Sequence, residues 1–265
     1  MPKGTDMQSD KEFMGFGEDH EPLRVIGPGK RGQYMRGIFS TQKSNEGAIR
    51  TLQPLTMDGL VAFDVHPDVV CIHAFPIKVS YMEADRYGPT GSVEHIPEFG
   101  VWTRDQRAIY YDVIRLEDQR PWMPRQTERI RNALADFNAH YNVLDEESIL
   151  IQPRLRNLRI VRYHARHAKE HAIVRVRQVL QQLGPVTTIG HVTAGAGLPV
   201  LENQVFDEDG VIVHTERLAI DDAFTALMNL AAAGEVRLDM SRPNLPDATR
   251  VKVTERYLYG MGGDV

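Results

Sequence analysis

The sequence contains a single cysteine, Cys71, among its 265 residues. One cysteine excludes an internal disulfide and a zinc site built from several cysteines. The sequence also lacks an apolar run of the roughly 20 residues that a membrane-spanning helix needs. Its first twenty residues are polar and lack the apolar segment of a signal peptide. We therefore expect no membrane association and a location in the reducing cytoplasm.

Positive charge is also in short supply, because 31 Lys and Arg stand against 36 Asp and Glu, a net charge of -5. This balance excludes a protein coated with positive charge for nucleic-acid binding, but it leaves room for a local basic stripe. No GxxxxGK[ST] phosphate-binding loop occurs in the chain. Apolar residues at 42% and charged residues at 25% are typical of a globular protein with room for two domains.

The first half alternates between helical and strand patterns. Apolar spacing predicts helices at residues 55–63 and 126–140, and β-branched alternation predicts strands at 69–82, 95–102 and 108–116, with one more after residue 140. The turn at residues 103–106 joins two of these strands into a hairpin. We expect an α/β (α+β) domain over residues 25–150, with a mixed sheet and flanking helices, preceded by a flexible arm at residues 1–24.

The second half predicts helices followed by a wing. A basic helical segment at residues 154–183 ends at Gly184, a short helix falls within 187–199, and an Ala-rich helix starts at a capping Asp and ends at Gly234. Strands are predicted on either side of residues 240–247. Helices followed by a two-stranded wing predict a winged helix-turn-helix domain over residues 151–265.

The hairpin carries two acids that could hold a metal ion. Glu98 follows a proline, and Asp112 lies on the second strand, so both can converge on one Mg²⁺ or Mn²⁺ of the kind used in phosphodiester hydrolysis. Asp58, on the preceding helix, could supply a third carboxylate. Side chains alternate along a strand, so Ile114 occupies the position where a catalytic cation would face the metal. Acids in an ordinary surface hairpin are the alternative interpretation.

The order of motifs along the chain resembles that of TnsA-type transposase endonucleases. The matching stretches are GIFSTQK (37–43), LTMDGLVAFDVHPDVV (55–70), HAFPIKVSY (73–81), PEF (97–99), DVI (112–114) and RLRNLRIVRYHAR (154–166). The resemblance implies a PD-(D/E)xK restriction-endonuclease-like fold followed by a winged helix. It also implies DNA, a transposase subunit and an ATP-using regulator as partners.

The chain departs from the family pattern at the catalytic positions. Thr56 stands where the family has its helix glutamate, Glu98 replaces the hairpin aspartate, and Ile114 replaces the lysine. Losing one such electrostatic donor typically costs about 3 kcal/mol of transition-state stabilisation. Lys78 and His95 are the nearest candidates to replace the missing cation. We therefore expect little or no DNA cleavage, and the sequence leaves open whether the protein is an enzyme.

The basic segment is the candidate DNA-contacting surface. Residues three or four apart share a helix face, so its arginines predict a stripe for phosphates. The candidates are Arg154, Arg156, Arg159, Arg162 and Arg166. The alternative is that these arginines pair with acids of the first domain. His164, His167 and His171 are predicted on one solvated helix face, and Asn229 is the single base-reading side chain of the Ala-rich helix.

Three functions follow from these observations. The first is a TnsA-like DNA-binding protein of a transposon or other mobile element, acting at DNA ends with partner subunits and with nuclease activity reduced or absent. The second is a non-enzymatic winged-helix DNA-binding or adaptor protein on a nuclease-fold scaffold. The third is an active metal-dependent DNA endonuclease with relocated catalytic residues.

Overall fold

The computed structural model describes residues 11–27, 35–85, 88–206 and 212–256. The chain divides into two compact units. The first comprises residues 1–64 and 68–151, and the second comprises residues 65–67 and 152–265. Within the described residues, no helix is long and apolar enough to cross a membrane.

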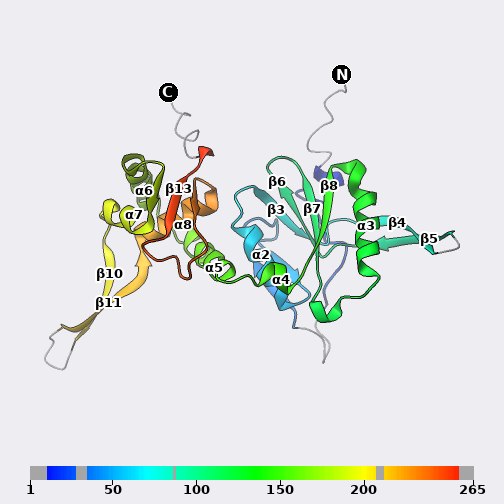
Figure 1. The fold of residues 1–265 in the computed structure, drawn as a ribbon, viewed down its shortest axis with the longest axis horizontal. Helices are drawn as coiled ribbons and strands as arrows, with labels where there is room; N and C mark the ends of the chain where they lie inside the picture. Colours follow the sequence, from blue (N-terminus) through cyan, green and yellow to red (C-terminus); the bar gives the residue numbers. More distant parts are fainter. Residues whose placement is uncertain (1–10, 28–34, 86–87, 207–211, 257–265) are drawn as a thin grey trace, which may run out of the picture. The chain divides into compact units, whose positions relative to one another are not determined.

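A four-stranded mixed sheet forms the centre of the first unit (Figure 1). Its strands are β3 (Val69–Ala74), β6 (Phe99–Thr103), β7 (Ala108–Val113) and β8 (Ala139–Leu144), in the order β3-β6-β7-β8. β3, β6 and β7 pair antiparallel, whereas β7 and β8 pair parallel. A parallel pair needs a crossover, and helix α3 (Met123–Leu134) provides it.

Helices cover both faces of this sheet. Successive large side chains of β7 point to opposite faces, so each face offers an apolar surface to a helix. Tyr110 is fully buried in a cluster that includes Ile130 of α3. Tyr111 points to the other face, where its ring lies 4.7 Å from that of Phe63 in α2 (Pro54–Asp64) and 5.1 Å from that of Phe99. This alternation places α2 and α3 on opposite sides of the sheet (Figure 1).

The described part of the first unit also includes two hairpins and three short helices. The hairpins are β1 (Gly37–Ser40) with β2 (Ala48–Thr51), and β4 (Val79–Asp85) with β5 (Gly88–His95). The short helices are η1 (Leu116–Asp118), η2 (Ala135–Phe137) and α4 (Glu146–Ile149). A reciprocal capping box between Asp145 and Ser148 fixes the start of α4.

The predicted flexible arm at residues 1–24 is wrong for residues 11–24. Met14 is 6% exposed and Phe16 is 1% exposed, and both pack in the cluster around Tyr110. The Tyr110 hydroxyl donates a 2.8 Å hydrogen bond to the carbonyl oxygen of Met14. Two apolar side chains in a mainly polar segment are enough to anchor it, since each buried side chain of this size contributes roughly 2 kcal/mol. Residues 1–10 lie outside the described residues.

The described part of the second unit includes four helices and two small sheets. The helices are α5 (Arg154–Ala165), α6 (Glu170–Leu183), α7 (Ile189–Ala196) and α8 (Asp222–Ala233). A three-stranded antiparallel sheet has the order β12 (Val236–Leu238), β13 (Arg250–Val253), β9 (Val186–Thr188), and β10 (Val200–Phe206) pairs with β11 (Ile212–Asp221). Helix α8 is central, because Leu227, Met228 and Leu230 are fully buried and α5, α6 and α7 all contact it.

The mixed helix-and-strand class predicted from the sequence is confirmed, with three differences in the second half. The basic segment forms two helices, since the main chain leaves α5 after Arg166 and is extended at Lys169. Both helices pack on α8, and one continuous helix would carry its second half away from that surface. The structure adds the hairpin of β10 and β11 and the third strand β9, which the sequence pattern does not predict.

Candidate functional site

Three motif positions meet at one end of the first unit's sheet. The hydroxyl of Thr56, in α2, donates a 2.7 Å hydrogen bond to Oε1 of Glu98. The main-chain amide of Glu98, just before β6, donates a 2.9 Å hydrogen bond to Oδ1 of Asp112 in β7. The separations in sequence are 42 and 14 residues, so the tertiary fold rather than local structure brings these groups together.

Glu98 occupies a dry environment, with 6% of its surface exposed. Burial raises the pKa of its carboxyl to about 7, and the negative charge of Asp112 adds to the rise. Hydrogen bonds from the Thr56 hydroxyl and from the main-chain amide of Leu52, at 3.4 Å, oppose it. A carboxyl with a raised pKa holds its proton more readily, and a hard cation has to displace that proton in order to bind.

Asp112 already has protein groups on both carboxylate oxygens. Oδ1 accepts the amide of Glu98, and Oδ2 accepts a 2.5 Å hydrogen bond from the hydroxyl of Tyr141 in β8. Nε2 of His95, the last residue of β5, lies 2.6 Å from the same Oδ2. Burial and the Asp112 charge raise the pKa of Tyr141, so this hydroxyl stays a donor at neutral pH. Asp112 is thus fixed in position by three neighbours.

Of the two cations proposed to replace the missing lysine, one reaches the site. His95 contacts Asp112, whereas Lys78 forms an exposed ion pair with Glu94 at 3.0 Å. Ile114 follows β7 and is partly buried, so the family's lysine position carries an apolar side chain. His95 is the positively chargeable group that the fold moves next to Asp112.

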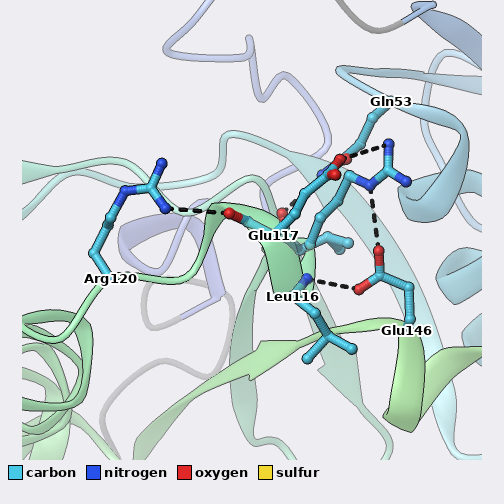
Figure 2. Close-up of polar contacts among 7 residues, drawn as sticks. Gln53, Leu116, Glu117, Arg120 and Glu146 are labelled. Carbon is cyan, nitrogen blue, oxygen red and sulfur yellow. Dashed lines mark hydrogen bonds and ion pairs between the residues drawn. The ribbon is translucent and has the colours of Figure 1, made fainter.

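Arg115, adjacent to Ile114, is held away from Asp112 by acids beyond β7. Its guanidinium lies 3.2 Å from Glu146 and 3.3 Å from Glu117. Figure 2 shows this region, where the other oxygen of Glu146 accepts the amide of Leu116 at 2.8 Å. Gln53 approaches from the start of α2 and donates a 2.8 Å hydrogen bond to the carbonyl oxygen of Val113 (Figure 2). These contacts fix the end of β7 and give Arg115 a structural role.

Asp58, predicted as a third carboxylate, lies in α2 two residues beyond Thr56 and is partly buried. The structure brings Glu98 and Asp112 together, through the hydrogen bond from the Glu98 amide to the Asp112 carboxylate.

These donors do not fit a magnesium site of the kind that the motif implies. Mg²⁺ prefers a near-octahedral shell of oxygen ligands. Thr56 offers a neutral hydroxyl that is bound to Glu98, burial raises the pKa of Glu98, and Asp112 accepts hydrogen bonds on both oxygens. Within the described part of the chain, no group of three His, Cys, Asp or Glu side chains is arranged to hold a metal ion. Mg²⁺ or Mn²⁺ at Glu98 and Asp112 thus stays a sequence prediction that the donor chemistry does not favour.

The arginines predicted to contact DNA lie mainly on the solvent side of α5. Leu155 and Val161 face the core of the second unit. Arg162 is partly buried, and the exposed arginines are Arg154, Arg156, Arg159 and Arg166. Asn157 is fully buried between them and donates hydrogen bonds of 3.0 and 2.7 Å to the carbonyl oxygens of Met240 and Arg242. This amide ties α5 to the loop between β12 and β13.

Two arginines of α6 have partners within the second unit. Arg177 forms a two-point pair with Glu235, at 2.9 and 2.6 Å, and Arg175 donates to the carbonyl oxygen of Ala196 at 3.0 Å. Asn229 of α8 donates a 2.9 Å hydrogen bond to the carbonyl oxygen of Ala165. The single side chain of α8 suited to reading bases is therefore engaged within the unit.

The three histidines predicted on one helix face are separated by the break between α5 and α6. His164 lies in α5, with Nδ1 2.9 Å from the hydroxyl of Thr225, and His171 lies in α6. His167 lies in the connection, with Nδ1 2.6 Å from the carbonyl oxygen of Tyr163. The prediction of a shared helix face is wrong.

Sequence reasoning missed Tyr141 and Gln53 as neighbours of the cluster. Tyr141 lies on β8, directly opposite Tyr110 of the parallel strand β7. The Tyr141 hydroxyl reaches Asp112, two residues beyond Tyr110 in β7. A parallel pairing across a helix leaves no local signal that fixes the register, so the sequence alone did not indicate this contact.

No protein-family model and no curated protein matches the chain. Function is therefore inferred from the geometry of the cluster, from the surface of α5 and from the order of motifs.

Proposed function

We propose that this chain is a TnsA-like DNA-binding protein of a transposon or other mobile element, with nuclease activity reduced or absent. The observation that carries the proposal is the meeting of Thr56, Glu98 and Asp112 at one end of the sheet. These are the positions at which the resembled family has its acidic residues. The mixed sheet with α3 crossing between parallel strands suits a PD-(D/E)xK fold, and α6 to α8 with the β12-β13-β9 sheet suit a winged helix.

The chemistry of the cluster supports reduced activity. A metal-dependent nuclease needs charged oxygen ligands and a cation close to the scissile phosphate. Here a hydroxyl, a buried carboxyl with a raised pKa and a carboxylate that accepts hydrogen bonds on both oxygens take the ligand positions. Ile114 places an apolar side chain where the resembled family has its cationic lysine. The His95 ring contacts Asp112.

DNA contact is proposed for α5 through phosphates rather than bases. Its exposed arginines suit sequence-independent binding, which depends strongly on salt. Because Asn229 is engaged and most of α8 is buried, base reading by α8 is not favoured. The same two facts favour the second candidate, a non-enzymatic adaptor whose winged helix docks on a partner protein. A transposase subunit and an ATP-using regulator are the partners that the resemblance implies.

A plasmid assay tests the proposal. Wild-type protein should leave supercoiled plasmid intact in Mg²⁺ and in Mn²⁺. The double variant Thr56→Glu/Ile114→Lys should nick it detectably and more than either single variant, because metal placement and charge stabilisation act as a unit. Adding Asp112→Ala to the double variant should abolish the nicking. Robust nicking by the wild type that Asp112→Ala removes would establish the active-nuclease alternative, and absence of duplex binding would overturn the proposal itself.

A further inference from the structure

Helix α5 presents one large aromatic side chain to solvent, Tyr163, which is 58% exposed. Three of the exposed arginines of this segment share its spacing, namely Arg156, Arg159 and Arg166. These four positions follow one another at intervals of three, four and three residues, which places them on one face of the helix. The tyrosine therefore lies within the row of arginines for which DNA contact is proposed.

Two histidine rings contact Tyr163 and limit its orientation. The ring of His164 stands edge-on to the tyrosine ring, with centroids 5.2 Å apart and planes inclined by 86°. The ring of His167 lies 4.8 Å from the tyrosine ring, with the planes inclined by 37°. More than half of the Tyr163 surface nevertheless stays open to solvent. The side chain is thus held in place without being covered.

Both histidines are held by further contacts. Nδ1 of His164 lies 2.9 Å from the hydroxyl of Thr225, and its ring packs edge-on against Phe224 at 4.9 Å, both in α8. Nδ1 of His167 lies 2.6 Å from the carbonyl oxygen of Tyr163. The exposed tyrosine is therefore linked through His164 to the central helix of the unit. A side chain that is ordered before binding loses less entropy when a ligand packs on it.

The surroundings of Tyr163 on α5 suit a nucleic acid. The helix contains no Asp or Glu, so its own charged side chains are all basic. Basic side chains follow the phosphates of a single strand, and an aromatic face gives its bases a surface on which to stack. A paired base within a duplex is covered on both faces by its neighbours, so an unpaired base is the one that can reach such a ring.

We propose that Tyr163 is a stacking platform for one base, and that the α5 surface therefore binds DNA with unpaired bases. The ligand class is a single-stranded segment, whether isolated or overhanging at a duplex end. Stacking uses the face of a base and reads no sequence, so it agrees with the sequence-independent binding proposed for α5. This inference rests on the proposed function, because it specifies the form of DNA that the same surface binds.

Fluorescence anisotropy of the full chain with labelled DNA tests the inference. The probes are a single strand without self-complementarity and the blunt duplex of the same sequence. Tyr163→Ala should weaken binding to the single strand on the order of tenfold and change duplex binding by less than about twofold. Tyr163→Phe should bind both probes like the wild type, because phenylalanine keeps the aromatic face. Arg156→Glu should weaken both by similar factors, since it acts on phosphates.

Trp122→Ala is the matched control, because Trp122 is a similarly exposed aromatic side chain, at 56%, that lies outside α5. It should bind both probes like the wild type. Tyr163→Trp reports stacking directly, since a stacked base quenches tryptophan fluorescence. The single strand should quench this variant more than the wild type, and the duplex should not. Because Tyr163 is exposed, its variants should keep the wild-type circular dichroism spectrum.

Three results would overturn the platform. Equal losses on both probes in Tyr163→Ala, or an equal loss in Tyr163→Phe, would show that the hydroxyl contacts a phosphate instead. Unchanged single-strand binding in Tyr163→Ala, with duplex binding that still depends on Arg156, would leave the proposed function intact and assign Tyr163 to a protein contact. Absence of binding to either probe would overturn the proposed function and the platform together.

Discussion

The two units bury different kinds of side chain. Among the described residues, the buried groups of the first unit include a carboxyl, Glu98, and an imidazole, His73. Those of the second unit are apolar apart from Asn157 and three threonines. Burying an ionisable group costs stability unless it is fully paired. The buried ionisable groups therefore lower the stability of the first unit, and Glu98 does so within the candidate site. The second unit has a core without such groups, and its proposed role lies at its surface.

The largest effect is expected from the core of the second unit. Leu227 is fully buried in α8, so Leu227→Ala should lower the free energy of unfolding by about 2 to 5 kcal/mol. Leu183, which is 41% exposed at the end of α6, should lose less than about 1 kcal/mol in the same substitution. Urea unfolding followed by circular dichroism measures both changes.

Tryptophan fluorescence gives the internal control for this comparison, because both tryptophans belong to the first unit. The first unit's transition should stay in place in Leu227→Ala. An equal shift of the fluorescence transition would contradict the picture of two separate cores.

Glu98 should produce the strongest pH dependence in the first unit. Its folded pKa, about 7, is raised above the unfolded value of 4.5. The folded state therefore holds the proton more tightly, and this contribution to stability is present in full below pH 4.5 and is lost as pH rises through 7. Glu98→Gln keeps an acceptor for Thr56 and removes the buried charge, so it should stabilise the first unit at pH 8 by up to about 3 kcal/mol.

Fluorescence-monitored unfolding at several pH values between 5 and 8 measures this difference. The wild type should lose stability across the range relative to Glu98→Gln, and the two should converge towards pH 5. Glu94→Gln is the control, because Glu94 forms only an exposed ion pair with Lys78. A wild type whose stability relative to Glu98→Gln does not change with pH would show that Glu98 ionises as an exposed carboxyl does.

Much of the first unit could be predicted because its signals are local. The periodic apolar residues of α2, the alternation in β7 and the turn at residues 103–106 each lie within one short window of sequence. The anchoring of residues 11–24 was missed because it depends on two side chains, Met14 and Phe16, that fill a distant cluster. The β10–β11 hairpin pairs residues for which the sequence analysis predicts no strand.

The candidate site likewise has residues that a local sequence signal identifies and contacts that depend on the tertiary fold. Glu98 and Asp112 could be identified because their motif is short and their strands are adjacent. The contact of His95 with Asp112 depends on where the β4–β5 hairpin ends in space, and that of Tyr141 depends on the parallel register of β8.

A smaller effect is expected on the surface of the second unit, in DNA binding. Arg156→Glu/Arg159→Glu reverses two exposed charges on α5 and should weaken binding to unrelated duplexes by a similar factor, roughly ten- to a hundredfold at low salt. Fluorescence anisotropy at several salt concentrations should also show a shallower salt dependence. Arg125→Glu, an exposed position on α3, is the control for a general change in charge. Unchanged affinity in the double variant would assign these arginines a structural role.

The smallest effect is expected at the start of α8. Asp221 caps this helix, since its side chain accepts hydrogen bonds from the amides of Ala223 and Phe224 at 2.8 and 3.2 Å. Asp221→Ala leaves these amides without that partner and should destabilise the second unit by about 1 kcal/mol, measured by circular dichroism with no shift in tryptophan fluorescence. Asp221→Asn keeps the capping oxygen and should lose only a few tenths of that amount, because asparagine caps nearly as well as aspartate. An equal loss in both variants would show that the negative charge near the helix N-terminus, rather than the hydrogen bonds, supplies the stabilisation.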